Sequence, residues 1–247
     1  RIISPHYGLF SRPNHVEYID WVKRWGGNAI RVFAYHEWGE GKFVPWDGDN
    51  PGNLTGLDRI REVIRTANER GIWIVLTLFQ NNDDFGRGVV ARPREELREY
   101  IRQIVEGTRH LAVIYESTNE DDSHEFNLFV LGEIWRYVQH DRTCAYHNPA
   151  LGAHWTNYHT GDLTRYDNRG IAHIILSNDT PSAILGPSDE DYIRWVGEAN
   201  AIRPIGSFEI LTAWSRPGKG GEGFAGNSIP DMERHWDRVL EAVKNLP

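Results

Sequence analysis

Short apolar runs alternate along the chain with longer stretches in which apolar residues recur every three or four positions. A run such as Ile72–Phe79 is apolar at nearly every position, which is typical of parallel strands that are covered on both faces. Seven segments have this character and are predicted to be strands: His6–Phe10, Asn28–Tyr35, Ile72–Phe79, Leu111–Ser117, Ala150–Trp155, Ala172–Ser177 and Arg203–Ile210.

The stretches between these runs predict amphipathic helices. In the helix predicted over Leu57–Arg70, Thr55 is the expected N-cap and Gly71 ends the helix. The same reasoning gives six helices in all: Asn14–Trp25, Leu57–Arg70, Pro93–Glu106, Ser123–His140, Ser188–Asn200 and, approximately, Pro230–Asn245.

The alternation continues without a break in composition, which predicts one parallel α/β domain over residues 1–247. This pattern fits a closed (β/α)8 TIM barrel or an open doubly wound sheet. A barrel needs eight strands, whereas only seven are counted. Because Thr212–Ile229 is rich in glycine and polar residues, the eighth strand is left as uncertain or missing.

Composition narrows the function classes. The net charge of −8 argues against a nucleic-acid partner, and no apolar stretch approaches the roughly 20 residues of a membrane span. Cys144 is the only cysteine, which rules out an intramolecular disulfide and a cysteine-based zinc site.

We expect no cofactor and no required metal, and the oligomeric state stays open. The chain begins at Arg1 rather than Met, so we interpret it as a processed chain or a fragment and favour secretion.

Two glutamates stand where strands end. Glu120 follows the apolar strand that leads into Asn119, and the carboxyl ends of barrel strands are where catalytic groups are placed. Glu209 lies inside an apolar run, where an unpaired carboxylate costs several kcal/mol. The alternatives are that Glu120 is a solvated loop acid and that Glu209 forms a structural ion pair with Arg31.

Glu116 is a rival to Glu120 as the acid. It lies four residues earlier, on the same strand face by the two-residue period but deeper in the fold. We expect it to be a buried structural partner of Arg31.

A pair of carboxyl groups facing one sugar is what glycoside hydrolysis needs. One carboxyl protonates the leaving oxygen, while the other stays ionised and attacks the anomeric carbon. An arginine beside Glu209 would keep that carboxylate ionised, and its negative charge would raise the pKa of Glu120.

These motifs resemble the clan A glycoside hydrolases, which are retaining (β/α)8-barrel enzymes that include cellulases and β-mannanases. Tyr115–Glu120 is similar to the motif in which the acid/base glutamate follows an asparagine at the end of the fourth strand. Glu209 resembles the nucleophile that ends the seventh strand, and Gly27–Arg31 resembles the second-strand motif whose arginine supports it. Asn81–Gly86 is similar to part of the third βα unit of β-mannanases. The resemblance favours the closed barrel.

Three positions depart from the family pattern. Asp121 stands where a proline commonly follows Asn-Glu, and the His-x-Tyr pattern of the sixth strand is replaced by Ile175–Asp179. The tryptophan that normally ends the eighth strand has no clear counterpart, and Trp214 is the candidate to substitute for it.

The resemblance implies a set of roles. Asn119 would bind the sugar 2-hydroxyl and Arg31 would orient Glu209. The remaining expected substrate-binding residues are three stacking tryptophans and two cleft-lining residues: Trp38, Trp155, Trp214, Asn81 and His154.

The expected function is therefore a retaining glycosidase acting on an oligo- or polysaccharide with β linkages, with β-mannan or β-glucan as the guess. Two alternatives remain: a non-catalytic barrel that binds carbohydrate, and an unrelated barrel enzyme in which Glu209 and Arg31 are only a structural pair.

Overall fold

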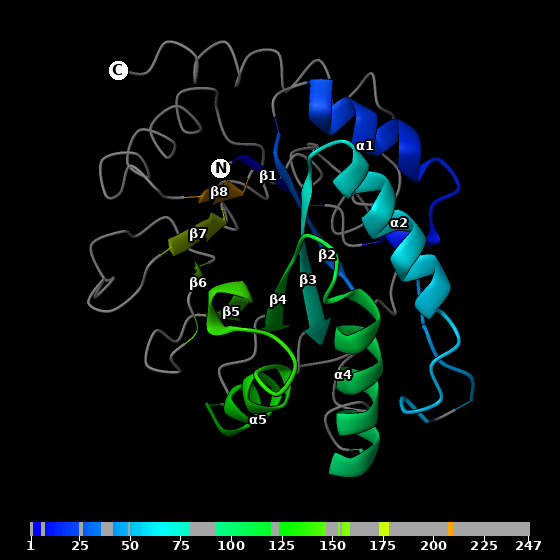
Figure 1. The fold of residues 1–247 in the computed structure, drawn as a ribbon, viewed down its shortest axis with the longest axis vertical. Helices are drawn as coiled ribbons and strands as arrows, with labels where there is room; N and C mark the ends of the chain where they lie inside the picture. Colours follow the sequence, from blue (N-terminus) through cyan, green and yellow to red (C-terminus); the bar gives the residue numbers. More distant parts are fainter. Residues whose placement is uncertain are drawn as a thin grey trace, which may run out of the picture.

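Eight parallel strands form a closed barrel in the computed structural model of the chain (Figure 1). The structure describes residues 2–5, 8–24, 27–35, 42–48, 50–79, 92–119, 124–146, 153, 155–158, 173–177 and 207–209. Each strand pairs with the next along the chain, and the last pairs with the first through Ile2–Phe208 and Ile3–Glu209. The closed barrel predicted from the sequence is confirmed, and the open sheet is excluded.

The strands are short, and each lies parallel to both of its neighbours. Their bounds are β1 Ile2–Pro5, β2 Ala29–Phe33, β3 Trp73–Phe79, β4 Val113–Thr118, β5 Thr143–Tyr146, β6 Trp155–Tyr158, β7 His173–Ser177 and β8 Ser207–Glu209.

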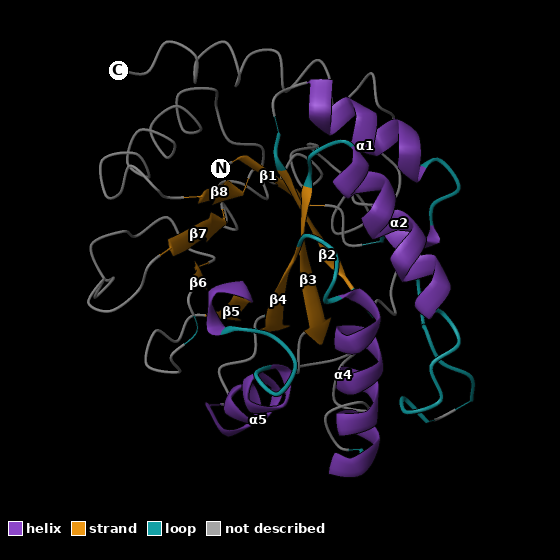
Figure 2. Cartoon of the chain, viewed as in Figure 1, coloured by secondary structure: helices purple, strands orange, loops and turns teal. Residues whose placement is uncertain are grey.

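The described helices lie outside the strands (Figure 2). Neighbouring helices pack on one another in chain order, α1 on α2, α2 on α4 and α4 on α5. No helix in the described part of the chain is both long and apolar enough to span a bilayer. The bounds are η1 Leu9–Ser11, α1 His15–Arg24, α2 Leu57–Glu69, α4 Arg94–Thr108, α5 His124–Ile134 and η3 His140–Arg142.

Two strand assignments from the sequence were wrong, because the first strand was misplaced and one strand was missed. The predicted first strand, His6–Phe10, is preceded by the observed β1, and Leu9–Ser11 forms a 3-10 turn whose Leu9 and Phe10 are buried. A buried turn shows the same apolar run as a strand. The sequence also missed β5, because Thr143–Tyr146 is only four residues long and begins with a polar residue.

This correction renumbers the later strands. The predicted fifth strand, Ala150–Trp155, reaches only the first residue of β6, and the predicted sixth corresponds to β7. The predicted seventh strand becomes β8, so Glu209 lies on the eighth strand and not on the seventh. The eighth strand is therefore present, whereas the segment considered for it, Thr212–Ile229, lies outside the described residues.

Three of the predicted helices agree with the structure within one or two residues, but two details differ. The fourth ends at Ile134 rather than His140, because Trp135 turns to stack on His140, with ring centroids 4.2 Å apart, and donates to Thr143. The N-cap of α2 is Gly56, with no side-chain hydrogen bond, so Thr55 is not the cap. The helices predicted over Ser188–Asn200 and Pro230–Asn245 lie outside the described residues.

Buried apolar side chains form two layers. The larger layer lies between strands and helices and takes alternate strand residues such as Ile30, Val32 and Leu76. The smaller contains strand residues alone: Ala29, Val75, Ile114 and Cys144, with Trp73 against it. Because these strand residues alternate with those of the helix-facing layer, the smaller layer faces the barrel interior. Burial on both faces explains the nearly continuous apolar runs of the sequence.

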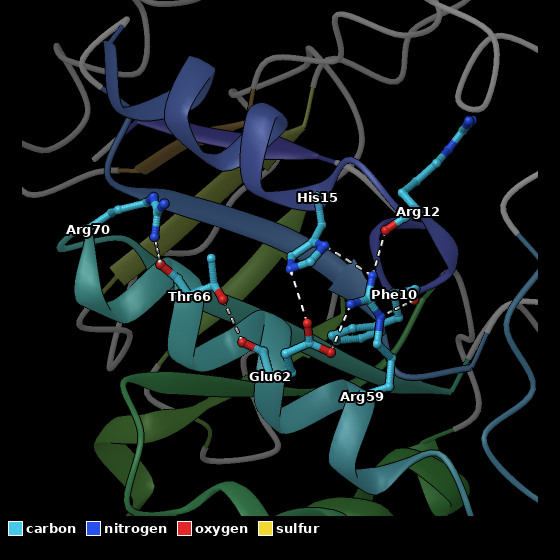
Figure 3. Close-up of polar contacts among 7 residues, drawn as sticks. All are labelled: Phe10, Arg12, His15, Arg59, Glu62, Thr66 and Arg70. Carbon is cyan, nitrogen blue, oxygen red and sulfur yellow. Dashed lines mark hydrogen bonds and ion pairs between the residues drawn. The ribbon is translucent and has the colours of Figure 1, made fainter.

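The segment after β1 is held to α2 by Arg59, as Figure 3 shows. Its guanidinium donates to the carbonyl oxygens of Phe10 (2.8 Å) and Arg12 (2.5 Å) and lies 3.2 Å from His15 Nδ1. His15 Nε2 lies 3.7 Å from Glu62, which also accepts a hydrogen bond from Arg59. His15 is 6% exposed, so its ring is enclosed by these charged groups.

Burial lowers the pKa of His15 below its ordinary value of 6.5, and the positive charge of Arg59 lowers the pKa further, against the opposing effect of Glu62. The unfolded chain therefore takes up this proton at a higher pH than the folded protein does. The contribution of neutral His15 to stability is complete above about pH 6.5 and is lost as the pH falls toward its lowered pKa.

We predict that His15→Asn makes the free energy of unfolding depend less on pH between about pH 6.5 and pH 5, because asparagine can still accept from Arg59 but does not titrate. Chemical denaturation at a series of pH values measures this dependence. The matched control is His110→Asn, which makes the same substitution at an exposed histidine. Parallel curves for the wild type and His15→Asn would contradict the assignment.

Candidate active site

A polar cluster lies inside the barrel on three neighbouring strands. Arg31 on β2, Thr77 on β3 and Glu116 on β4 are all 0% exposed. Arg31 stands between two residues that face the helices, which directs its side chain into the barrel. Thr77 and Glu116 are direct register partners. The fold thus places one cation, one hydroxyl and one carboxylate at one level of the interior.

Two of these side chains donate to one carboxylate oxygen of the third. Arg31 Nε donates to Glu116 Oε2 over 2.7 Å, and the Thr77 hydroxyl donates to the same oxygen. The sequence prediction that Glu116 is a buried partner of Arg31 is confirmed. Removing two charges from water is expensive, and such a pair is tolerated only when the geometry is good and further hydrogen bonds satisfy it.

The other side of the guanidinium reaches the end of β4. Arg31 Nη2 donates to Asn119 Oδ1 over 2.9 Å, and the Asn119 backbone N–H donates to the Phe79 carbonyl over 2.9 Å. Asn119 is 7% exposed. Asn119 is therefore held through its side chain by Arg31 and through its backbone by Phe79, at the carboxyl end of the barrel, where βα loops form active sites.

Helix α5 also holds the end of β4. The hydroxyls of Ser117 and Thr118 both donate to Asn127 Oδ1, over 2.5 and 2.7 Å, and all three residues are buried. Thr77 and Asn127 were not predicted from the sequence. The available signal was a single polar residue inside an apolar segment, which is the strand Trp73–Phe79 for Thr77 and the run Phe126–Leu131 for Asn127.

Glu209 is the last residue of β8. Its Cα pairs with Ser177 on β7 and with Ile3 on β1, and Ile3 pairs with Ala29, two residues before Arg31. One strand, β1, lies between the strands of Glu209 and Arg31. The contact expected between these two side chains stays a prediction.

The structure brings together two of the predicted site residues, Arg31 and Asn119. Trp155 begins β6, where its Cα pairs with Cys144 and His173. The other predicted site residues lie outside the described part of the chain: Glu120, Trp38, Asn81, His154 and Trp214.

Metal-ligating groups are not clustered in the described part of the chain. No three histidine, cysteine or acidic side chains there are placed to hold an ion. Cys144 is buried in the interior apolar layer. The described site therefore presents one oriented side-chain amide, that of Asn119, at the carboxyl end of the barrel.

Comparison with solved structures finds the same fold. An endo-1,4-β-mannanase from Rhizomucor miehei covers 98% of this chain, with 94% of its own chain matched, 14% identity and a TM-score of 0.60. A broad-specificity endoglucanase of glycoside hydrolase family 5 from Clostridium longisporum is also similar. The match covers 94% of this chain and 86% of that one, at 13% identity and a TM-score of 0.60.

A third similar structure is a glycoside hydrolase family 5 enzyme from Prevotella bryantii, a mutant bound to a xyloglucan tetradecasaccharide. The coverages are 92% of this chain and 86% of that one, at 12% identity and a TM-score of 0.57. No protein-family model matches the chain, and no curated protein matches its sequence. At these identities the likeness shows the fold alone, a (β/α)8 barrel of the kind that these glycoside hydrolases have.

We predict that Glu116→Gln lowers the free energy of unfolding by about 3 kcal/mol, because it leaves the Arg31 charge buried without its counter-charge. Denaturant titration with a comparison of midpoints and slopes measures the change.

The matched control is Glu106→Gln, which removes the exposed partner of Arg102 on α4 and should cost no more than about 1 kcal/mol. Equal stability of the two variants would show that the interior pair does not hold the barrel together.

Proposed function

We propose that this chain is a retaining glycoside hydrolase that cleaves β-linked glycans. The observation that carries the proposal is the buried network from Glu116 through Arg31 to Asn119, which presents one amide at the carboxyl end of β4. A protein that needed the network only for stability could use apolar residues, since buried ion pairs are often replaceable without loss.

Asn119 is suited to bind the sugar hydroxyl next to the reacting carbon. Its Oδ1 accepts from Arg31, which fixes the amide plane and leaves Nδ2 as the donor for substrate. A hydrogen bond to the 2-hydroxyl strengthens as the anomeric carbon gains positive charge, so it contributes more in the transition state than in the ground state.

Glu120 follows Asn119 directly and is proposed as the acid/base. In the first step its carboxyl group protonates the glycosidic oxygen as the bond to the anomeric carbon breaks. In the second step the resulting carboxylate removes a proton from the attacking water.

Glu209 is proposed as the nucleophile. Its carboxylate forms a bond to the anomeric carbon and gives a glycosyl-enzyme ester, which water then hydrolyses with net retention of configuration. Retention requires the carboxyl groups of Glu120 and Glu209 to lie about 5–5.5 Å apart across the barrel mouth. The family pattern has its nucleophile on the seventh strand, whereas Glu209 ends β8 here.

The substrate class is proposed from chemistry and from the similar structures. Aromatic side chains stack on the C–H faces of sugars, and Trp38, Trp155 and Trp214 are the proposed platforms, with Asn81 and His154 in the cleft. The similar proteins are named as mannanases and endoglucanases, and one of them binds xyloglucan. A β-mannan or β-glucan is therefore the proposed substrate.

We predict that the wild type hydrolyses members of a panel of aryl β-glycosides and dyed β-glycans, and that Glu209→Ala lowers kcat about a thousandfold or more. Added azide should restore turnover of the aryl glycoside in this variant, because the small anion occupies the space left by the carboxylate and forms a glycosyl azide.

Glu106→Ala on the exposed side of α4 is the control and should retain full activity. Sugar binding without turnover, unchanged in Glu120→Gln, would contradict the proposal and favour a carbohydrate-binding barrel. An active Glu209→Ala would remove Glu209 from the mechanism.

A further inference from the structure

The end of β4 departs from the regular alternation of a strand. Strict alternation would put Ser117 and Asn119 on one face and Thr118 on the other. The contacts differ, because Ser117 and Thr118 both reach Asn127 on α5, while Asn119 reaches Arg31, which comes from the barrel interior. Ser117 and Thr118 thus both donate to Asn127 Oδ1 on the helix side of the sheet, and the side chain of the next residue, Asn119, points to the barrel interior.

Such breaks in alternation change the direction in which a side chain points, and they are common next to active sites. Before the break the pattern is regular, with Tyr115 bonded to Thr108 of α4 and Glu116 facing Arg31. The residue that the break turns inward is the one that the proposed mechanism places against the sugar.

Asn127 is an unexpected residue for its position. It is 1% exposed, and its neighbours Phe126, Val130 and Leu131 belong to the helix-facing apolar layer. Burying an amide among apolar side chains is costly unless hydrogen bonds satisfy it, so an aliphatic residue would serve packing alone equally well. The two hydroxyls that Asn127 binds stand directly before Asn119.

We propose that Asn127 is a positioning residue for the reaction, which holds the break at Ser117 and Thr118 and thereby aims Asn119 at the barrel mouth. It acts through the backbone of β4 and does not touch substrate. The inference rests on the proposed function for its kinetic consequence, whereas its structural consequence stands without it.

The kinetic test compares Asn127→Ala with Asn127→Asp. The alanine variant releases both hydroxyls, and misplacing a transition-state contact by about 1 Å costs roughly 100-fold, so kcat should fall by about that factor with little change in KM. Aspartate keeps an acceptor oxygen for both hydroxyls and should recover much of the lost kcat. Equal kcat values for the two variants would overturn the proposal.

Asn68 provides the matched control. It is an asparagine on α2 whose amide also ties a helix to strand ends, donating to the Ile72 carbonyl (2.9 Å) and accepting from the Ala112 N–H (2.7 Å). These contacts lie at the start of β3 and β4, the opposite end of the barrel. Asn68→Ala should lower the melting temperature and leave kcat unchanged. A comparable loss of kcat in Asn68→Ala would show that general destabilisation explains the effect.

Amide hydrogen exchange separates this inference from the proposed function. The Asn119 N–H donates to the Phe79 carbonyl, and it should lose protection in Asn127→Ala but keep it in Asn68→Ala. Retained protection in Asn127→Ala overturns the inference whatever the activity is. If the wild type cleaves no glycan, the proposed function fails and the exchange result alone decides the inference.

If Asn127→Ala does not fold, Thr118→Val takes its place in both measurements. Valine has the shape of threonine and removes the hydrogen bond from Thr118 to Asn127.

Discussion

Burial of opposite charges inside the barrel is the constraint on which the described structure depends. The ion pair between Arg31 and Glu116 has no exposed surface, so neither charge can recover its lost hydration from solvent. The pair is tolerable only if Arg31, the Thr77 hydroxyl and Glu116 meet in one place, which requires β2, β3 and β4 to hold their register. The interaction that specifies the strand pairing therefore also orients the guanidinium that holds Asn119. Stability and the geometry of the candidate site follow from the same contact.

The barrel interior is layered along its axis. Ala29, Val75, Ile114 and Cys144 form an apolar layer, and two residues further along β2, β3 and β4 stand the members of the polar cluster. The apolar layer lies below the cluster on these strands, and electrostatic interactions strengthen where water is excluded. Beyond the polar cluster lies the carboxyl end of β4. There Arg31 binds Asn119 from the barrel interior, and Asn127 of α5 binds the hydroxyls of Ser117 and Thr118 from outside the barrel. The carboxyl end of β4 is thus supported from both sides of the sheet.

Much of this arrangement could be predicted from the sequence, because polar residues inside apolar strands are informative. Arg31 and Glu116 stood out as charges in runs that predict burial on both faces, and their pairing was predicted correctly. The strand count failed where local pattern is ambiguous, since the buried turn at Leu9 and Phe10 has the pattern of a strand and the four-residue β5 has too little pattern of its own. Thr77 and Asn127 were missed because a small neutral polar residue in an apolar segment can be satisfied in many ways, and only tertiary contacts decide which. The same limit applies to Glu209, whose strand number depended on finding β5.

In the proposed mechanism, the barrel breaks glycosidic bonds through a covalent ester on Glu209. Incubation with 2-deoxy-2-fluoro β-glycosides of the gluco and manno series that carry a dinitrophenyl leaving group tests it most directly. The fluorine destabilises both transition states, while the good leaving group still permits the first step, so the ester accumulates. Mass spectrometry of the intact protein and of its peptic peptides should show one added sugar, located on Glu209. A sugar on any other residue, or none from either series on a folded protein, would contradict the account.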